Sequence, residues 1–355
     1  MKKIAKEILL PISSIFLAFL VGAVIIKVSG RSPFLAYQSL LMGGFGSLGN
    51  LAQTCLFSIP LIFTGLSVAL AYKCGLFNIG GEGQFLLGGL FAMAAAIYIH
   101  APFIIHFPLC LLCGFAGGAV AGAIPGWLKA RYGIHEVINT IMLNWICLNF
   151  VTYIVNGPMR SHSGLGTPEP LKTAVPPLII PDSLIPGNQL NIGFIIAIIF
   201  VLLVGFYLSR TVQGYELKAV GLNPMAAEYG GISISKNIFL ALCLAGGLSG
   251  LGGTFYYLGD LGRIPSTLSF PGYGFEGIAV ALVGKLDPLG VFLASLLFGA
   301  LESGGIFMQL NANVPKDLVT IIQGLVIIFV IAPGLVQSVF NWYRGKKERE
   351  GFEYS

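Results

Sequence analysis

Charge is the first thing that this sequence has little of. Of its 355 residues, 10% are charged and 55% are hydrophobic. A soluble chain of this length needs far more charge to cover its surface, so the composition excludes a soluble domain and predicts a polytopic membrane protein. The net charge of +5 is not gathered in a basic patch interleaved with aromatic residues, so we expect no nucleic-acid partner.

Motifs for catalysis and for cofactor binding are also missing. No Gly-x4-Gly-Lys-Ser/Thr segment is present, so this chain has no P-loop for ATP. The six cysteines lie in or beside apolar runs, and we expect them to be small core residues without disulfides or metal. Ser249 lies in a motif like that of rhomboid proteases, but all four histidines come earlier in the chain, the reverse of the order in those enzymes. We therefore predict no enzyme and no cofactor bound by this chain.

Long apolar runs make up most of the sequence. A helix that crosses a bilayer needs about 20 residues, and a further run at 277–283 is so short that it fits only a half-helix. The long runs lie at 8–28, 51–72, 84–99, 104–128, 137–155, 191–209, 237–258, 288–304 and 317–335. We predict one all-α membrane domain over residues 1–355, with about 9–10 transmembrane helices, some of them broken.

The distribution of basic residues predicts the orientation. With ten spans and the N-terminus inside, most of the 20 lysines and arginines fall in cytoplasmic segments, which places both termini in the cytoplasm. The first run follows three lysines without a convincing cleavage site, so we expect a retained helix rather than a removed signal peptide. In this topology, about 156–190 is an external loop and about 210–236 is the largest cytoplasmic loop.

Polar residues interrupt the apolar sequence at 75–89. Asn78, Glu82 and Gln84 stand there among several glycines, with apolar runs on both sides. Irregular backbone at membrane depth is tolerated only where it is buried in protein or lines a cavity. A carboxylate within the bilayer costs about 2.5–3.5 kcal/mol, so it needs a partner or an aqueous path. We predict a broken helix whose polar groups face a pathway.

A second segment has the same local pattern. Gly81-Glu82-Gly83 begins an apolar run in the first half, and Phe275-Glu276-Gly277 begins another in the second half. Matching interrupted segments in two halves are typical of a transporter with an internal repeat and a substrate site between the repeats. Glu82 and Glu276 have two open interpretations: they accept hydrogen bonds from a polar solute, or they cap helix N-termini.

Two asparagines also have more than one interpretation. Asn78 precedes two glycines, which favours a role in organising the backbone. Glu136, Thr140 and Asn144 recur on one face of a helix. Such a polar stripe lines a cavity or joins helices, and we favour a cavity for Asn144 because it lies deepest in the run.

The cytoplasmic loop predicts a short helix with both ends specified. Asn223 suits the N-cap, Pro224 the first helical position and Gly230 the C-cap. A helix of about one and a half turns would leave Met225 and Tyr229 exposed to water, so we expect it to dock a partner.

Four segments together resemble the permease subunits of bacterial ABC importers. The resemblance covers about residues 30–335 and is nearest to the branched-chain amino acid and simple-sugar permeases, in particular their nucleoside (guanosine-type) members. The segments are GLFNIGGEGQ at 75–84, TIMLN at 140–144, AVGLNP at 219–224 and GFEGIAVAL at 274–282.

The resemblance implies a larger machine in the bacterial plasma membrane. A separate ATPase, which uses the ATP, would dock on the helix at 223–231. A second, related permease would complete the pathway, and a secreted or lipid-anchored binding protein would deliver the solute. The residues expected to couple to the ATPase are Gly221, Asn223, Pro224, Ala226, Ala227, Glu228 and Gly231.

We therefore predict the permease subunit of an ATP-driven importer for a small polar solute, with a nucleoside favoured. Phe275 would stack on such a solute, although a sugar fits nearly as well. The alternatives are a simple-sugar permease and an ion-coupled transporter that uses Glu82, Glu276 and Glu302 as ion sites. The predicted pathway residues are Asn78, Glu82, Asn144, Phe275 and Glu276.

Overall fold

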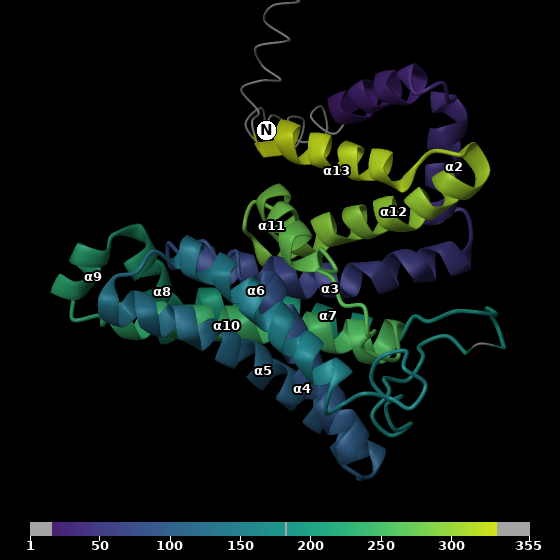
Figure 1. Cartoon of the computed structure of the whole chain (residues 1–355). Helices are drawn as coiled ribbons and strands as arrows, with labels where there is room; N and C mark the ends of the chain where they lie inside the picture. Colours follow the sequence, from purple (N-terminus) through teal and green to yellow (C-terminus); the bar gives the residue numbers. More distant parts are fainter. Residues whose placement is uncertain (1–15, 182, 332–355) are drawn as a thin grey trace, which may run out of the picture. The chain divides into compact units, whose positions relative to one another are not determined.

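The computed structural model describes residues 16–181 and 183–331 (Figure 1). Over these residues the regular structure is helical, with isolated β-bridges and no strand, which confirms the all-α prediction. A helix at Phe16–Val28 is followed by α2 (Pro33–Phe45), α3 (Leu48–Lys73), α4 (Gly81–Tyr98), α5 (Phe103–Tyr132), α6 (Glu136–Asn156), α7 (Gly193–Arg210), α8 (Val212–Leu222), α9 (Pro224–Tyr229), α10 (Ile234–Phe255), the π-helical turn η1 (Tyr256–Asp260), α11 (Tyr273–Val283), α12 (Pro288–Ala312) and α13 (Lys316–Ile331).

The apolar runs predicted from the sequence coincide with these helices. Of the described helices, six are long and apolar enough to cross a membrane: α3, α5, α6, α7, α10 with η1, and α12. Among the others, α4 has 18 residues but is not among these six, and α11 has only 11 residues. Parts of the runs at 8–28 and 317–335 lie outside the described residues. The prediction of a multi-pass membrane protein with short helices among long ones is confirmed, and the internal repeat stays a prediction.

The chain forms two compact units, one of residues 1–50 and 301–355 and one of residues 51–300. The described part of the first unit has its own apolar core, which includes Ile26 and Leu40 from the N-terminal segment and Met308 and Ile322 from the C-terminal one. The Ser303 hydroxyl also donates to the Gly43 carbonyl over 2.8 Å. The two glutamate-containing segments, 75–89 and 274–282, both belong to the second unit.

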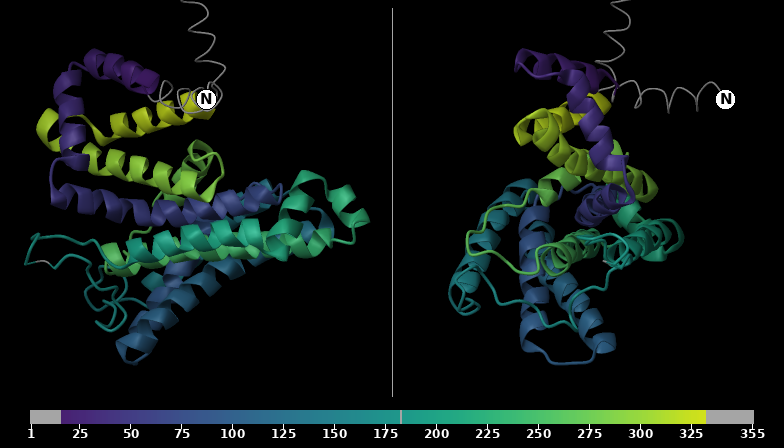
Figure 2. Two further views of the ribbon diagram at one scale, coloured as in Figure 1. Left: turned by 180° about the vertical axis from the view of Figure 1, so that it is seen from behind. Right: turned by 90° about the vertical axis from the view of Figure 1, so that its right-hand side faces the viewer.

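The second unit is built around α4. Every residue from Gly81 to Leu90 is buried, and α5 and α10 lie alongside α4 and each other (Figure 2). The glycine ladders of α5 and α10 allow this contact, because a Cβ on Gly118 would meet the Gly246 carbonyl and a Cβ on Gly122 would meet that of Leu242. Glycines at this four-residue spacing let the two helix backbones pack tightly.

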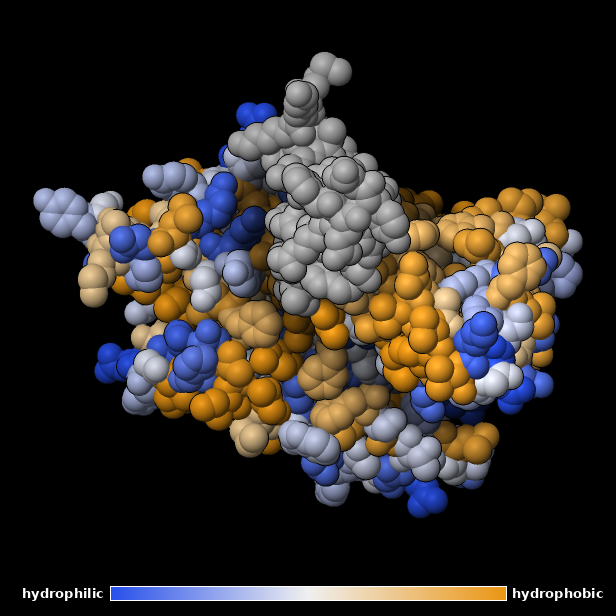
Figure 3. Space-filling model, turned by 90° about the horizontal axis from the view of Figure 1, so that it is seen from above, coloured by the Kyte–Doolittle hydropathy of each residue, from blue (hydrophilic) through white to orange (hydrophobic). Residues whose placement is uncertain are grey.

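The outer helices turn apolar side chains outward. Ile104 on α5 and Leu202 and Phe206 on α7 are among the exposed large hydrophobic residues, and much of the surface in Figure 3 is apolar. A soluble protein would bury such side chains, whereas lipid covers them in a membrane. The second unit therefore has a polar interior segment at the start of α4 and apolar outer faces.

Candidate functional site

The starts of α4 and α11 meet through Glu82. The Glu82 carboxylate accepts hydrogen bonds from the backbone N–H groups of Gly272 (2.7 Å), Gly274 (2.6 Å) and Phe275 (3.3 Å). These N–H groups belong to the open first turn of α11, where a helix has unsatisfied donors and a partial positive charge. Glu82 is 0% exposed. It therefore caps α11, a helix that begins about 190 residues later in the chain, and not its own helix.

Glycines make this α4–α11 junction close enough for capping. Gly272 lies at the N-cap of α11 with φ of 96°, a left-handed conformation that a side chain disfavours. A Cβ on Gly274 would meet the backbone of Glu82, and a Cβ on Gly83 would lie 2.8 Å from Asn144 Cα. The glycines around Glu82 therefore allow direct backbone contact between α4, α6 and α11.

Asn78 and Gln84 form a reciprocal amide pair just before and within α4. Asn78 Nδ2 donates to Gln84 Oε1 (2.8 Å), and Gln84 Nε2 donates back to Asn78 Oδ1 (3.2 Å). The same Asn78 oxygen accepts from Gly80 N (3.1 Å), which closes an Asx turn. Both side chains are buried. The backbone-organising role predicted for Asn78 is confirmed.

Asn144 joins α6 to the start of α4. Its Oδ1 accepts from Gly83 N (2.8 Å), and its Nδ2 donates to the Ile79 carbonyl (2.9 Å). From α10, Ser249 Oγ donates to the Gly81 carbonyl over 2.6 Å. Of the two interpretations offered by the sequence, the buried Asn144 side chain takes the joining one. The open first turn of α4 and the irregular residues just before it need hydrogen-bond partners from neighbouring helices. Its role as a pathway residue stays a prediction.

Phe275 and Glu276 lie in the first turn of α11 and are less buried than Glu82. Phe275 is 43% exposed and meets Phe270 edge to face, with ring centroids 6.1 Å apart. Glu276 is partly exposed. Of the five predicted pathway residues, three are therefore used inside the junction and two border its surface.

The cytoplasmic loop of the prediction contains two helices, not one. Sequence reasoning missed α8, but the ends of α9 are as predicted: Asn223 Oδ1 accepts from Ala226 N (3.1 Å), Pro224 begins the helix and Gly230 ends it. The two helices enclose a hollow of about 450 Å³, whose lining includes Tyr215, Ala226 and Ala227. The α8–α9 pair thus combines a short helix with capped ends and an adjacent open hollow.

Large apolar side chains stand out from this pair. Leu222, Met225 and Tyr229 are almost fully exposed, and Tyr229 reaches 98%. On a water-facing segment such a cluster is costly unless another protein covers it. Glu228 is also exposed, whereas Ala227 is buried against the helix pair.

Gly221 ties this helix pair to the stretch that leads into α4. A Cβ on Gly221 would meet the Lys73 carbonyl and would lie 2.9 Å from Gly75 N. Gly75 has φ of 74° and lies at the end of α3. Gly221 is therefore the position where the α8–α9 pair contacts the backbone that leads from α3 into α4.

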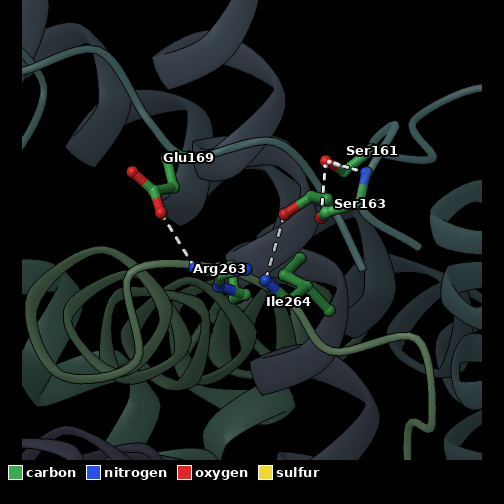
Figure 4. Close-up of polar contacts among 6 residues, drawn as sticks. Ser161, Ser163, Glu169, Arg263 and Ile264 are labelled. Carbon is green, nitrogen blue, oxygen red and sulfur yellow. Dashed lines mark hydrogen bonds and ion pairs between the residues drawn. The ribbon is translucent and has the colours of Figure 1, made fainter. Parts of the chain in front are cut away.

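The loop between α6 and α7 is attached to the irregular segment that precedes α11. Arg263 donates to Glu169 over 2.8 Å, beside the hydrogen-bonded Ser161 and Ser163 (Figure 4). The backbones of Thr167 and Ile264 are also hydrogen-bonded (3.0 Å). The segment 263–272 is therefore held at both ends. Residues 167 and 169 of the loop bond to its start, and Glu82 bonds to its last residue, Gly272.

Glu82 is one of the carboxylates named by the ion-site alternative, which stays a prediction. Glu82 is occupied by three backbone donors, and no cluster of three or more His, Cys, Asp or Glu residues that could hold a metal ion occurs within 16–181 and 183–331. Ser249, set aside as a nucleophile in the sequence, bonds to the backbone of α4.

Long apolar helices around a buried, glycine-rich junction define a multi-pass membrane protein. The model of the family "Branched-chain amino acid transport system / permease component" matches residues 50–331, and the chain belongs to this family of permeases. The chain is 36% identical to the guanosine ABC transporter permease NupP of Bacillus subtilis, over 99% of each chain. No solved structure matches.

Two further relatives are similar over most of their length. The chain is 36% identical to the nucleoside ABC transporter permease NupB of Lactococcus lactis, over 97% of this chain and 96% of the relative. It is 32% identical to the glucose ABC transporter permease TsgB13 of Haloferax volcanii, over 94% and 88%. The ABC permease family predicted from four short segments is confirmed.

Proposed function

We propose that this chain is the membrane-spanning permease subunit of an ATP-driven importer of nucleosides. The near full-length similarity to the guanosine permease NupP and the nucleoside permease NupB carries the choice of solute. The importer class agrees with the family and with the architecture, in which polar groups gather at one junction inside apolar helices. The chain itself binds no cofactor, and the ATP is used by a partner.

The ATPase docks on the α8–α9 pair. Exposed Leu222, Met225 and Tyr229 supply apolar anchors, and the hollow of about 450 Å³ beside them accepts side chains from the partner. Interface energy is concentrated in a few such anchors, among which Tyr is enriched. In this proposal α8 and α9 lie in the cytoplasm, and the ten-span topology expected from the basic residues puts both chain termini on the same side.

The contact at Gly221 transmits the movement of the docked ATPase. A displacement of α8 and α9 pushes directly on Lys73 and Gly75 because Gly221 leaves no room for a side chain between the two backbones. The push then reaches Glu82 through the short stretch 75–81 and passes to α11 through three hydrogen bonds. A rigid joint of this kind moves two helices together, and it lets the pathway open to the other side.

A second, related permease completes the pathway, and an extracytoplasmic binding protein delivers the solute. The external loop supplies a receiving surface, since its Glu169–Arg263 pair and backbone contacts connect it to the segment before α11. A binding protein bound to this loop would therefore act on the α4–α11 junction from the external side.

A sugar is the second candidate solute. The glucose permease TsgB13 is similar over most of both chains, and carboxylate and amide groups suit hydroxyls as well as nucleobases. Lower identity to TsgB13 than to NupP and NupB places the sugar second.

Uptake by the assembled transporter tests the proposal. Proteoliposomes with this permease, its ATPase and the second permease, together with the binding protein outside and ATP inside, should accumulate labelled guanosine and should stop when ATP is omitted. An excess of unlabelled nucleosides should compete, whereas glucose should not. Uptake that continues without ATP and collapses with an uncoupler would contradict the importer class, and competition by glucose alone would select the sugar.

A further inference from the structure

Trp145 lies in an unusual place for a membrane tryptophan. It is the tenth residue of α6, whose 21 residues run from Glu136 to Asn156, and it is 55% exposed. Tryptophans of membrane helices gather at the water interfaces, where their polar edge finds partners. Trp127 follows that rule, since it is equally exposed but lies near the basic end of α5, beside Lys129 and Arg131.

Two phenylalanines from a distant segment stand beside Trp145. Phe270 meets Trp145 edge to face, with centroids 5.0 Å apart and planes at 77°, and Phe275 meets Phe270 at 80°. Perpendicular rings leave part of each ring face uncovered by the others. The Phe275 N–H is also a donor to Glu82, so the aromatic group is attached to the α4–α11 junction.

Amide side chains share the exposed face of α6 with Trp145. Asn149 is one turn further along and is exposed, and its Nδ2 donates to the Trp145 carbonyl (2.8 Å). Asn156 lies on the same side near the helix end and donates to the Ser266 carbonyl (3.0 Å). An exposed amide oxygen beside the middle of a span is costly in hydrocarbon. The two amides therefore give this otherwise apolar face a polar strip beside Trp145, which hydrocarbon alone does not satisfy.

We propose that Trp145, Phe270 and Phe275, together with Asn149, form a stacking site for a planar heterocycle such as a nucleobase within the translocation path. The proposal rests on the nucleoside importer proposed above and adds the residues that recognise the base. Aromatic side chains bind the face of any base by stacking, and an amide binds its edge. Because Phe275 belongs to the first turn of α11, movement of that turn changes the spacing of the rings and releases the base.

Transport by three variants of the assembled importer tests the site. At a guanosine concentration below saturation, Trp145→Leu should lower ATP-driven uptake at least about tenfold, which is in the lower part of the range for stacking on one base. Trp145→Phe keeps a ring and should stay within about threefold of the unsubstituted chain. The matched control is Trp127→Leu, which removes an equally exposed tryptophan outside the site and should leave uptake unchanged.

Uptake and subunit composition of the Trp145→Leu complex together show whether a base, lipid or the second permease covers the exposed face of Trp145. Equal uptake by Trp145→Leu and the unsubstituted chain would mean that the face is covered by lipid and would overturn the proposal. Loss of the second permease from affinity-purified Trp145→Leu complexes would assign the face to a subunit interface, which also overturns it. Normal subunit composition with reduced uptake is the supporting result.

Fluorescence separates this inference from the proposed function. A permease that carries Trp127→Phe and Trp342→Phe keeps Trp145 as its only tryptophan. The emission of Trp145 is obtained by subtracting the spectrum of a second complex, in which Trp145 is also replaced by Phe. Guanosine, adenosine or uridine should quench that difference, and ribose should not. Quenching without transport would contradict only the importer of nucleosides, whereas transport without quenching by any nucleoside would contradict only the stacking site.

Discussion

The α4–α11 junction and the α8–α9 pair use similar residues in opposite ways. Each has a helix start, an asparagine, a glutamate and several glycines. In the junction Glu82 is fully buried and bonded to three N–H groups, whereas on α9 Glu228 is exposed and Tyr229 is 98% exposed. A site whose polar groups are satisfied within the chain holds the fold together. A site that leaves apolar groups in water is completed by another protein.

Removal of the two glutamates should give the largest contrast. Glu82→Ala leaves one buried and two part-buried N–H donors without an acceptor, at about 1–3 kcal/mol for the buried one, so we expect a clear loss of stability or of folded protein. Glu228→Ala removes an exposed carboxylate and should change the free energy of unfolding by less than about 0.5 kcal/mol. Thermal unfolding of the two purified variants in detergent measures both, and equal melting temperatures would contradict the capping role of Glu82.

The next largest effect should come from substitutions in α9, and it should appear in ATPase binding rather than in the stability of the permease. Tyr229→Ala removes an exposed ring, so the permease should melt as before while its affinity for the ATPase falls by about 2 kcal/mol, near thirtyfold. Ala226→Asp, in the lining of the hollow, should abolish the association. Co-purification and titration of the ATPase onto the detergent-solubilised permease check this. If both variants bound the ATPase normally, the docking site would lie elsewhere.

Sequence reasoning reached these two regions unequally, and their hydrogen bonds explain why. The caps of α9 lie within eight residues, so Asn223, Pro224 and Gly230 identify the helix directly. Glu82 bonds to residues 190 positions later, and Asn144 bonds to Gly83 and Ile79, more than 60 positions earlier. No local pattern specifies such distant partners. The sequence therefore predicted that Glu82 needs a partner or an aqueous path, but it left the choice open.

The helices, too, could be predicted only where a local sequence pattern specifies them. The long apolar runs predicted α3, α5, α6 and α10 because a membrane helix needs only a continuous apolar stretch. Sequence reasoning missed α8, since its mixed residues (Val212–Leu222) resemble a polar loop and its packing comes from α7, α9 and α10. Trp145 was missed as a site residue because Phe270 reaches it from another part of the chain.

Gly221 connects the two regions, and a methyl group there should separate their functions. Gly221→Ala forces Lys73 and Gly75 away, at about 1–3 kcal/mol, so we expect ATPase binding to persist while transport per ATP hydrolysed falls several-fold. Gly205→Ala on α7 is the matched control, because a Cβ there has no neighbour closer than 4.0 Å. Uptake and ATP hydrolysis measured on the same proteoliposomes give the ratio. An unchanged ratio in Gly221→Ala would rule out coupling through this contact.

The smallest effect should come from the edge of the junction. Ser249→Ala removes one hydrogen bond to the Gly81 carbonyl and should cost about 1 kcal/mol without altering ATPase binding. Denaturant unfolding compared with Ser209→Ala, whose hydroxyl bonds only within exposed α7, measures the difference. Identical stabilities would show that Ser249 adds nothing to the junction.

Hydrogen–deuterium exchange of the permease with and without its ATPase tests the contrast between the two regions most directly. Amides at 272–276 should exchange slowly in both samples, because Glu82 and the helix hold them. Amides at 222–231 should exchange rapidly in the isolated permease and slow by at least tenfold when the ATPase binds. Rapid exchange at 272–276 in the isolated permease, or no change at 222–231 on ATPase binding, would contradict the account.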